Sequence, residues 1–192
     1  MSTAVATRTL TVDEFLNLPD YDRYELVDGE PKEDMVSFES SWVGGQALHR
    51  IAGHLDDHPL GWVLGADQLF RLWPDSLQTM RKPDVAFVPY ANAPRGPTPE
   101  PLITAVPALV VEVSSPSNTA DDLDLKVVQF LEVGVRLVWV IYPRTRMAQV
   151  FRADGSTTRL QENDDLDGED VLPGFKCRLS TVLPPRQPGS PS

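Results

Sequence analysis

The segment Ala108-Leu109-Val110-Val111-Glu112-Val113 is apolar except for a single carboxylate. A short apolar run of this kind is typical of a buried β-strand, where a lone ionised carboxylate would be costly. Earlier in the chain, Pro83-Asp84-Val85-Ala86-Phe87-Val88 repeats the pattern, with an acid at the start of another short apolar strand. Two acids placed in this way indicate a metal site.

The alternation of side chains along a strand decides which of these residues can meet. Val110 and Glu112 share one face of the predicted strand, and Asp84 shares a face with Ala86 and Val88. Neighbouring strands lie about 4.8 Å apart, so two carboxylates at matching heights on one face can hold a divalent cation between them. The cation would also offset the repulsion between the two acids.

A helix is predicted over residues 119–133, after a loop of turn-forming residues. Apolar side chains recur there with helical spacing, at Leu123, Val127, Phe130 and Leu131, and Gly134 provides a stop. Lys126 lies one residue off this apolar stripe. Its long side chain can therefore reach back toward the strand end that carries Glu112.

Together, Pro83-Asp84, Glu112 and Lys126 resemble the PD-(D/E)XK nuclease signature, and the flanking sequence resembles the Uma2 family (DUF820) of restriction-endonuclease-like proteins. The resemblance covers roughly residues 9–183, and its matching segments are Thr11–Leu16, Tyr24–Glu30, Lys82–Val88, Val110–Ser117 and Val138–Pro143. One departure concerns the lysine expected two residues after the acid, because Ser114 occupies that position. In the Uma2 branch the lysine lies on the following helix, where Asp122-Leu123-Asp124-Leu125-Lys126 matches.

The resemblance implies a Mg²⁺-dependent (or Mn²⁺-dependent) endonuclease that hydrolyses nucleic-acid phosphodiester bonds, in DNA rather than RNA. Asp84, Glu112 and the backbone carbonyl of Val113 would be the metal ligands, since a hard cation prefers oxygen. Lys126 would orient the attacking water or stabilise the developing negative charge. Analogy with other nucleases of this type also suggests a homodimer.

Glu25 is a further candidate for the catalytic site. It lies in a strand-like run within Tyr24–Glu30, a segment that is a hallmark of the Uma2 pattern. It could complete the ligand set of the metal. The alternative is a structural carboxylate that caps a turn or pairs with Arg23.

The predicted fold class is α/β, with a restriction-endonuclease-like core of order α-β-β-β-α-β and a central mixed sheet flanked by helices. An N-terminal helix and a β-hairpin turning at Asp28-Gly29 are expected as additions. The predicted helices are 11–17, 40–57 and 119–133, and the predicted strands outside the hairpin are 62–72, 83–88, 108–113, 137–142 and 147–152. Residues 1–183 are expected to form one endonuclease-like domain, followed by a disordered, Pro- and Ser-rich tail at 184–192.

Composition narrows the cellular setting. Neither a signal peptide nor an apolar stretch of about 18 residues is present, so we expect no membrane segment and a cytoplasmic location. The single cysteine, Cys177, excludes an internal disulfide and a cysteine-based zinc site, and it is interpreted as a packing residue.

The charge balance favours a second hypothesis. A formal net charge of −11 is unfavourable for a protein that binds a polyanion. A local basic rim could offset it, formed by Arg71, Arg81, Lys82, Arg144, Arg146 and Arg152. The acidic surface would also suit the alternative, a catalytically inactive nuclease-like fold that acts as a binding or assembly module, and convergence of Asp84, Glu112 and Lys126 on one cation would distinguish the two.

Histidines and tryptophans are two further candidate types of functional residue. His54 and His58 have the spacing of a zinc pair on one helical face, but Leu55 stands where a zinc protease has glutamate, and Pro59 ends the helix. His49 could face the site cleft, and the sequence leaves this open. Tryptophans could stack on bases, although core packing is favoured for Trp62 and Trp139.

Overall fold

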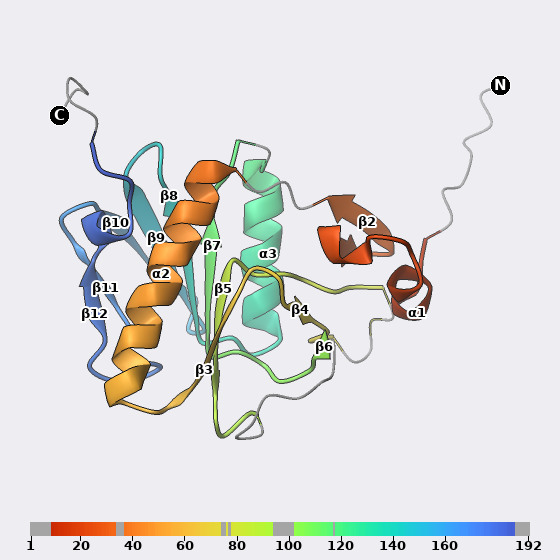
Figure 1. Cartoon of the computed structure of the whole chain (residues 1–192), viewed down its shortest axis with the longest axis horizontal. Helices are drawn as coiled ribbons and strands as arrows, with labels where there is room; N and C mark the ends of the chain where they lie inside the picture. The colour runs from red at the N-terminus through yellow and green to blue at the C-terminus, as the bar shows by residue number, and fades with distance from the viewer. Residues whose placement is uncertain are drawn as a thin grey trace.

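A six-stranded mixed sheet forms the centre of the molecule (Figure 1). The computed structural model describes residues 9–33, 37–73, 76, 78–93, 102–116 and 118–186. The strand order is β10-β9-β8-β7-β5-β3, with β7 and β8 parallel and all other neighbours antiparallel. The strands are β3 (Gly61–Gly65), β5 (Val85–Pro89), β7 (Leu109–Val113), β8 (Leu137–Tyr142), β9 (Met147–Arg152) and β10 (Thr157–Gln161).

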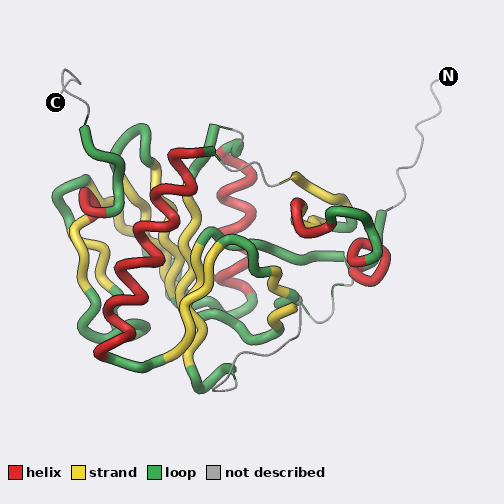
Figure 2. The backbone as a smooth tube through the Cα atoms, viewed as in Figure 1, coloured by secondary structure: helices red, strands yellow, loops and turns green. Residues whose placement is uncertain are grey.

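Two helices cover opposite faces of this sheet (Figures 1 and 2). One is α2 (Phe38–Asp57), which begins at a capping box between Ser37 and Ser40 and buries Val43, Ala47 and Ile51. The other is α3 (Ala120–Glu132), which begins at a capping box between Thr119 and Asp122. It buries Leu123, Val127 and Phe130 against the sheet, as their spacing predicted.

Alternation along β7 distributes its side chains between the two helices. Leu109, Val111 and Val113 pack in the core beneath α2, whereas Val110 packs in the core beneath α3. Glu112 shares the α3 side with Val110, as period-two alternation requires. The acid that interrupts the strand therefore points toward the helix that carries Lys126.

A small N-terminal unit lies beside α3 (Figure 1). It consists of α1 (Val12–Leu16), the 3-10 turn Tyr21–Arg23, and the hairpin of β1 (Tyr24–Val27) and β2 (Glu30–Glu33). Asp28 and Gly29 have positive φ angles of 51° and 81°, which this tight turn requires. The predicted N-terminal helix and hairpin are thus confirmed.

The segment before β5 links this unit to the sheet. Met80 forms an isolated bridge with Leu26 of β1, and Arg81 forms another with Phe70. The next residues, Lys82 and Pro83, lead directly into β5. The bridge at Met80 therefore places Arg81 and Lys82 next to β1 of the hairpin.

The predicted core order is confirmed as α2-β3-β5-β7-α3-β8. The single strand predicted at 62–72 is wrong, because the chain turns at 66–67 and separates β3 from β4 (Leu69–Phe70). The strand predicted at 83–88 begins only at Val85, so Asp84 precedes it. Short strands that the sequence did not reveal are β6 (Leu102–Ile103), β10, β11 (Asp165–Asp167) and β12 (Lys176–Arg178), followed by the 3-10 turn Leu179–Thr181.

The predicted tail is only partly covered by the structure. Pro184 accepts a hydrogen bond through its carbonyl from Arg146, and Arg186 pairs with Glu162, so this part of the tail packs on the domain. Residues 187–192 lie outside the described residues. Within the described ranges, no helix combines the length and the hydropathy needed to cross a membrane.

Candidate active site

The two acids predicted from the sequence lie on neighbouring strands. Val85 of β5 pairs with Val111 of β7, so Asp84 stands at the position opposite Glu112. The backbone N–H of Val113 donates to Asp84 Oδ2, with an N–O distance of 2.6 Å. This hydrogen bond fixes the half-buried aspartate at the carboxyl end of β7.

Lys126 reaches the same place from α3. Its Nζ lies 3.1 Å from Glu112 Oε2 and 3.2 Å from Glu25 Oε1. All three side chains are buried, with residue exposures of 3% for Glu112, 4% for Glu25 and 6% for Lys126. The expected proximity of Lys126 to Glu112 is therefore observed, while its role in chemistry remains a prediction.

Glu25 comes from the N-terminal hairpin and is held by several donors. Arg81 Nη1 donates to its Oε2 at 3.0 Å, and the backbone N–H of Lys82 donates to its Oε1 at 2.8 Å. The proposed pairing of Glu25 with Arg23 is wrong, because Arg23 turns outward and pairs with Glu33. Glu25 is instead part of the buried cluster.

Arg81 is itself anchored on α3. Its Nε and Nη2 both donate to Gln129 Oε1, at 2.9 and 2.6 Å. Gln129 lies three residues after Lys126, so both side chains project from the same side of the helix. The sequence pattern did not indicate that Arg81 and Gln129 belong to the site. The basic pair immediately before the acid strand was the available signal for Arg81, whereas Gln129 gave none.

The ammonium group of Lys126 contacts two buried carboxylates, Glu25 and Glu112, whose pKa values shift in opposite directions. Burial would raise the pKa of Glu25, but Lys126, Arg81 and the hydrogen bond from Lys82 together hold that pKa below its ordinary value. Burial raises the pKa of Glu112 to about 8, because Lys126 alone opposes it while Asp84 and Glu25 add repulsion. The single ammonium group of Lys126 is therefore not enough to keep Glu112 ionised at its ordinary pKa.

An unpartnered oxygen marks the same residue. Glu112 Oε1 is buried and has no hydrogen-bond partner among the residues that the structure describes. A buried acceptor without a partner is costly, and a cation at this position would satisfy it. The donor set of carboxylate and carbonyl oxygens is also the set that a hard divalent cation prefers.

The protein supplies only part of a coordination shell. In the described part of the chain, no three His, Cys, Asp or Glu side chains gather closely enough to hold a metal ion. Asp84 and Glu112, with a backbone carbonyl such as that of Val113, suit Mg²⁺, which keeps several waters when it binds proteins. The residues present fit such an ion.

The raised pKa of Glu112 predicts how stability depends on pH. Between about pH 4.5 and about pH 8, the folded protein retains a proton on Glu112 that the unfolded chain has released. The free energy of unfolding should therefore fall as pH rises through this range, by up to about 1.4 kcal/mol per pH unit. Glu112→Gln should lack this fall, so it should exceed wild type in stability near pH 8 and match it near pH 4.5.

Urea unfolding in EDTA across this pH range measures the difference. Glu33→Gln, which changes an exposed glutamate on the adjacent hairpin, serves as the control and should follow the wild-type curve. Parallel curves for Glu112→Gln and wild type would contradict the raised pKa.

The other predicted candidates lie elsewhere. His49 is exposed on α2, and His54 stacks on His58 with ring centroids 4.4 Å apart near the end of that helix. Trp139 is buried in the core, as predicted, and Trp62 packs edge-on against Tyr90.

Most of the local basic rim suggested by the sequence is not observed. Arg81 and Lys82 are buried, and Lys82 Nζ donates to the carbonyl of Asp22. Arg146 pairs with Glu162, and Arg152 pairs with Glu169. Most of the basic side chains that were expected to face a polyanion are therefore already paired with groups of the protein.

Comparisons with known proteins agree with this architecture. The model of the Uma2 family, described as "Putative restriction endonuclease", matches residues 12–181. A putative nuclease belonging to DUF820 from Anabaena variabilis ATCC 29413 has a similar structure, with a TM-score of 0.78 and 16% sequence identity over 90% of this chain and 97% of that one. At this identity the likeness shows the fold alone. No match is found among the curated proteins.

Proposed function

Because the chain belongs to the Uma2 family, whose description is that of restriction endonucleases, we propose that it is a divalent-metal-dependent nuclease that hydrolyses phosphodiester bonds in DNA. Family membership supports the nuclease-like function. The metal dependence is our proposal, and the observation that carries it is the buried, unpartnered Oε1 of Glu112 opposite Asp84. The preference for DNA over RNA rests on the family description.

The contacts of each residue suggest its role in the proposed reaction. Asp84, Glu112 and the Val113 carbonyl would hold the cation, which when bound lowers the pKa of a coordinated water and polarises a phosphoryl oxygen. Lys126 Nζ, 3.1 Å from Glu112 Oε2, can donate a hydrogen bond to a phosphoryl oxygen beside that carboxylate as negative charge develops on the oxygen. Glu25 Oε1, 3.2 Å from Lys126 Nζ, helps to keep the ammonium group in place.

The acidic surface supports a second candidate, a catalytically inactive fold that binds or assembles with a partner. Its support is the net charge of −11 together with the pairing of Arg146 and Arg152 with acids. A homodimer would be compatible with either function.

Cleavage assays separate the two candidates. Plasmid and oligonucleotide substrates are incubated with the protein in Mg²⁺, in Mn²⁺ and in EDTA, and Glu112→Ala is assayed in parallel. Cleavage that needs the metal and disappears in Glu112→Ala would support the nuclease. Intact substrates in every condition, with no Mn²⁺ binding by calorimetry, would favour the inactive module.

A further inference from the structure

A pocket of about 420 Å³ opens at the carboxyl ends of β7 and β8. These strands are parallel neighbours, with Val113 beside Ile141, and the loops that follow both strands line the pocket. Polar groups line both walls: Ser114, Ser115 and Asn118 after β7, and Tyr142, Arg144 and Thr145 after β8. The carboxyl ends of neighbouring parallel strands are a common position for ligands in α/β proteins.

The lining has the chemistry of an anion site. Among the residues that the structure describes, the lining contains one cation and no carboxylate, in a chain whose net charge is −11. Asn118 Oδ1 accepts from the backbone N–H and the hydroxyl of Ser115, at 2.8 and 2.9 Å. The Asn118 amide nitrogen is therefore the group of that side chain that can donate to a ligand.

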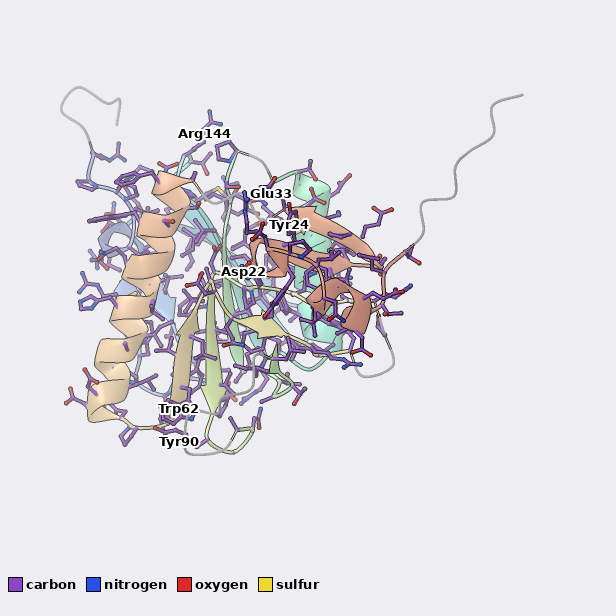
Figure 3. The ribbon with its side chains drawn as sticks, turned by 45° about the vertical axis from the view of Figure 1, so that its right-hand side comes forward. Asp22, Tyr24, Glu33, Trp62, Tyr90 and Arg144 are labelled. Carbon is purple, nitrogen blue, oxygen red and sulfur yellow. The ribbon has the colours of Figure 1, made fainter. Side chains whose placement is uncertain are left out.

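Arg144 differs from its basic neighbours in the same region. It is exposed and has no ion-pair partner in the described part of the chain, whereas Arg146 is paired with Glu162. Figure 3 shows Arg144 at one end of the molecule, with Trp62 and Tyr90 at the other. Its guanidinium is accordingly available at the edge of the pocket.

The pocket adjoins the candidate active site. Ser114, which lines the pocket, immediately follows the last residue of β7 and is two residues from Glu112, so their Cα atoms are at most about 7 Å apart. A nucleic-acid strand carries a phosphate at every nucleotide, about 3.4 Å apart along the axis of a duplex. On that scale, a strand with one phosphodiester at Glu112 would carry a further phosphate, one or two nucleotides away, at the pocket.

We propose that this pocket binds a phosphate group that flanks the scissile bond of a nucleic-acid strand, with Arg144 as its charged contact. The inference rests on the proposed function, because it places the cleaved bond at Glu112. It assigns substrate binding to a single local cation, where the sequence had suggested a rim of six. Arg144 is then a substrate-binding residue that takes no part in the chemical step.

Binding as a function of salt tests this proposal independently of cleavage. Fluorescence anisotropy of a labelled oligonucleotide duplex in EDTA gives the slope of log K against log salt for wild type, Arg144→Ala and Arg144→Lys. Loss of one phosphate contact should reduce the magnitude of that slope by about 0.9, and Arg144→Lys should retain it. In cleavage assays, Arg144→Ala should raise KM and leave kcat unchanged.

Arg50→Ala is the matched control. Arg50 is an exposed arginine on α2 that lines a separate pocket of about 340 Å³ with His54 and Phe175. Its removal changes the net charge equally and should leave the slope unaltered. Equal slopes for wild type and Arg144→Ala, or equal losses in Arg144→Ala and Arg50→Ala, would overturn the subsite, as would failure of the wild type to bind the duplex.

The two proposals can fail separately. A slope change confined to Arg144→Ala in a protein that never cleaves would keep Arg144 as a phosphate contact but overturn both the nuclease and the position of the pocket beside a scissile bond. Metal-dependent cleavage with an unchanged slope would keep the nuclease and remove the subsite.

Discussion

Asp84→Asn and Glu112→Gln are each expected to reduce kcat for DNA cleavage by at least about a thousandfold, because the stabilisation that a catalytic metal supplies amounts to several kcal/mol. Both substitutions keep the shape of the side chain and replace one carboxylate oxygen, a ligand that a cation prefers, by an amide nitrogen. Lys126→Met should reduce kcat by about a hundredfold to a thousandfold, as expected for loss of one group that stabilises developing charge. Single-turnover cleavage of a labelled oligonucleotide measures all three.

Substitutions of exposed residues of the same types show whether a loss of activity comes from the site or from the change in net charge. Lys32 Nζ contacts Asp122 at 3.1 Å, the same distance as between Lys126 and Glu112, but its side chain is 47% exposed. Lys32→Met and Glu33→Gln should therefore leave kcat within a factor of two or so, since exposed pairs contribute little. Circular dichroism of each variant shows whether it is folded, and Lys126→Arg keeps the buried charge if Lys126→Met does not fold. Wild-type kcat in folded Glu112→Gln would remove the residue from the mechanism.

Arg81→Ala is expected to lower the free energy of unfolding by about 3–5 kcal/mol, the cost of leaving a buried ionic group without its partner. Arg81 Nη1 lies 3.0 Å from Glu25 Oε2, and their side chains are only 3% and 5% exposed. The substitution also removes both hydrogen bonds to Gln129. Urea denaturation of wild type and variant measures the difference.

The neighbouring hairpin provides an almost ideal control for this experiment. Arg23 Nη2 lies 3.0 Å from Glu33 Oε1, the same separation, but these side chains are 62% and 45% exposed. Arg23→Ala should cost about 0–1 kcal/mol, because water and ions already screen the pair. Similar losses for the two arginines would show that burial is not what makes the Arg81 contact stabilising.

Local sequence pattern was sufficient for the centre of the fold. The apolar run around Glu112, the helical spacing of Leu123 and Val127, and the turn at Asp28-Gly29 each specify one element through a period or a required backbone conformation. The faces of Asp84 and Glu112 followed from alternation once their strands were neighbours. The predicted α/β core order and the Uma2 resemblance are confirmed on this basis.

The peripheral strands escaped prediction because they lack an apolar signal. Strand β10 reads Thr-Thr-Arg-Leu-Gln and is mostly exposed, and β11 reads Asp-Leu-Asp within an acidic stretch. Such segments become strands through pairing with a neighbour, β10 with β9 and β11 with β12, which is a tertiary effect.

The partners of charged residues were also beyond local pattern. Arg81 and Gln129 are 48 residues apart, and nothing within either segment indicates that they meet. The sequence placed Arg81 on a basic rim because a cation is exposed more often than not. Only the docking of the hairpin on α3 turns that arginine inward, so the burial of Arg81 depends on long-range topology.

Because Glu25 lies on the N-terminal hairpin, the buried cluster of Glu25, Arg81, Glu112 and Lys126 can form only late in folding. Glu25 meets Arg81 across 56 residues and meets Lys126 on a helix that is synthesised much later. Contacts so distant along the chain form only when the native topology has been reached. A nascent or partly unfolded chain therefore cannot assemble this cluster, so the proposed nuclease activity would be absent until folding is complete.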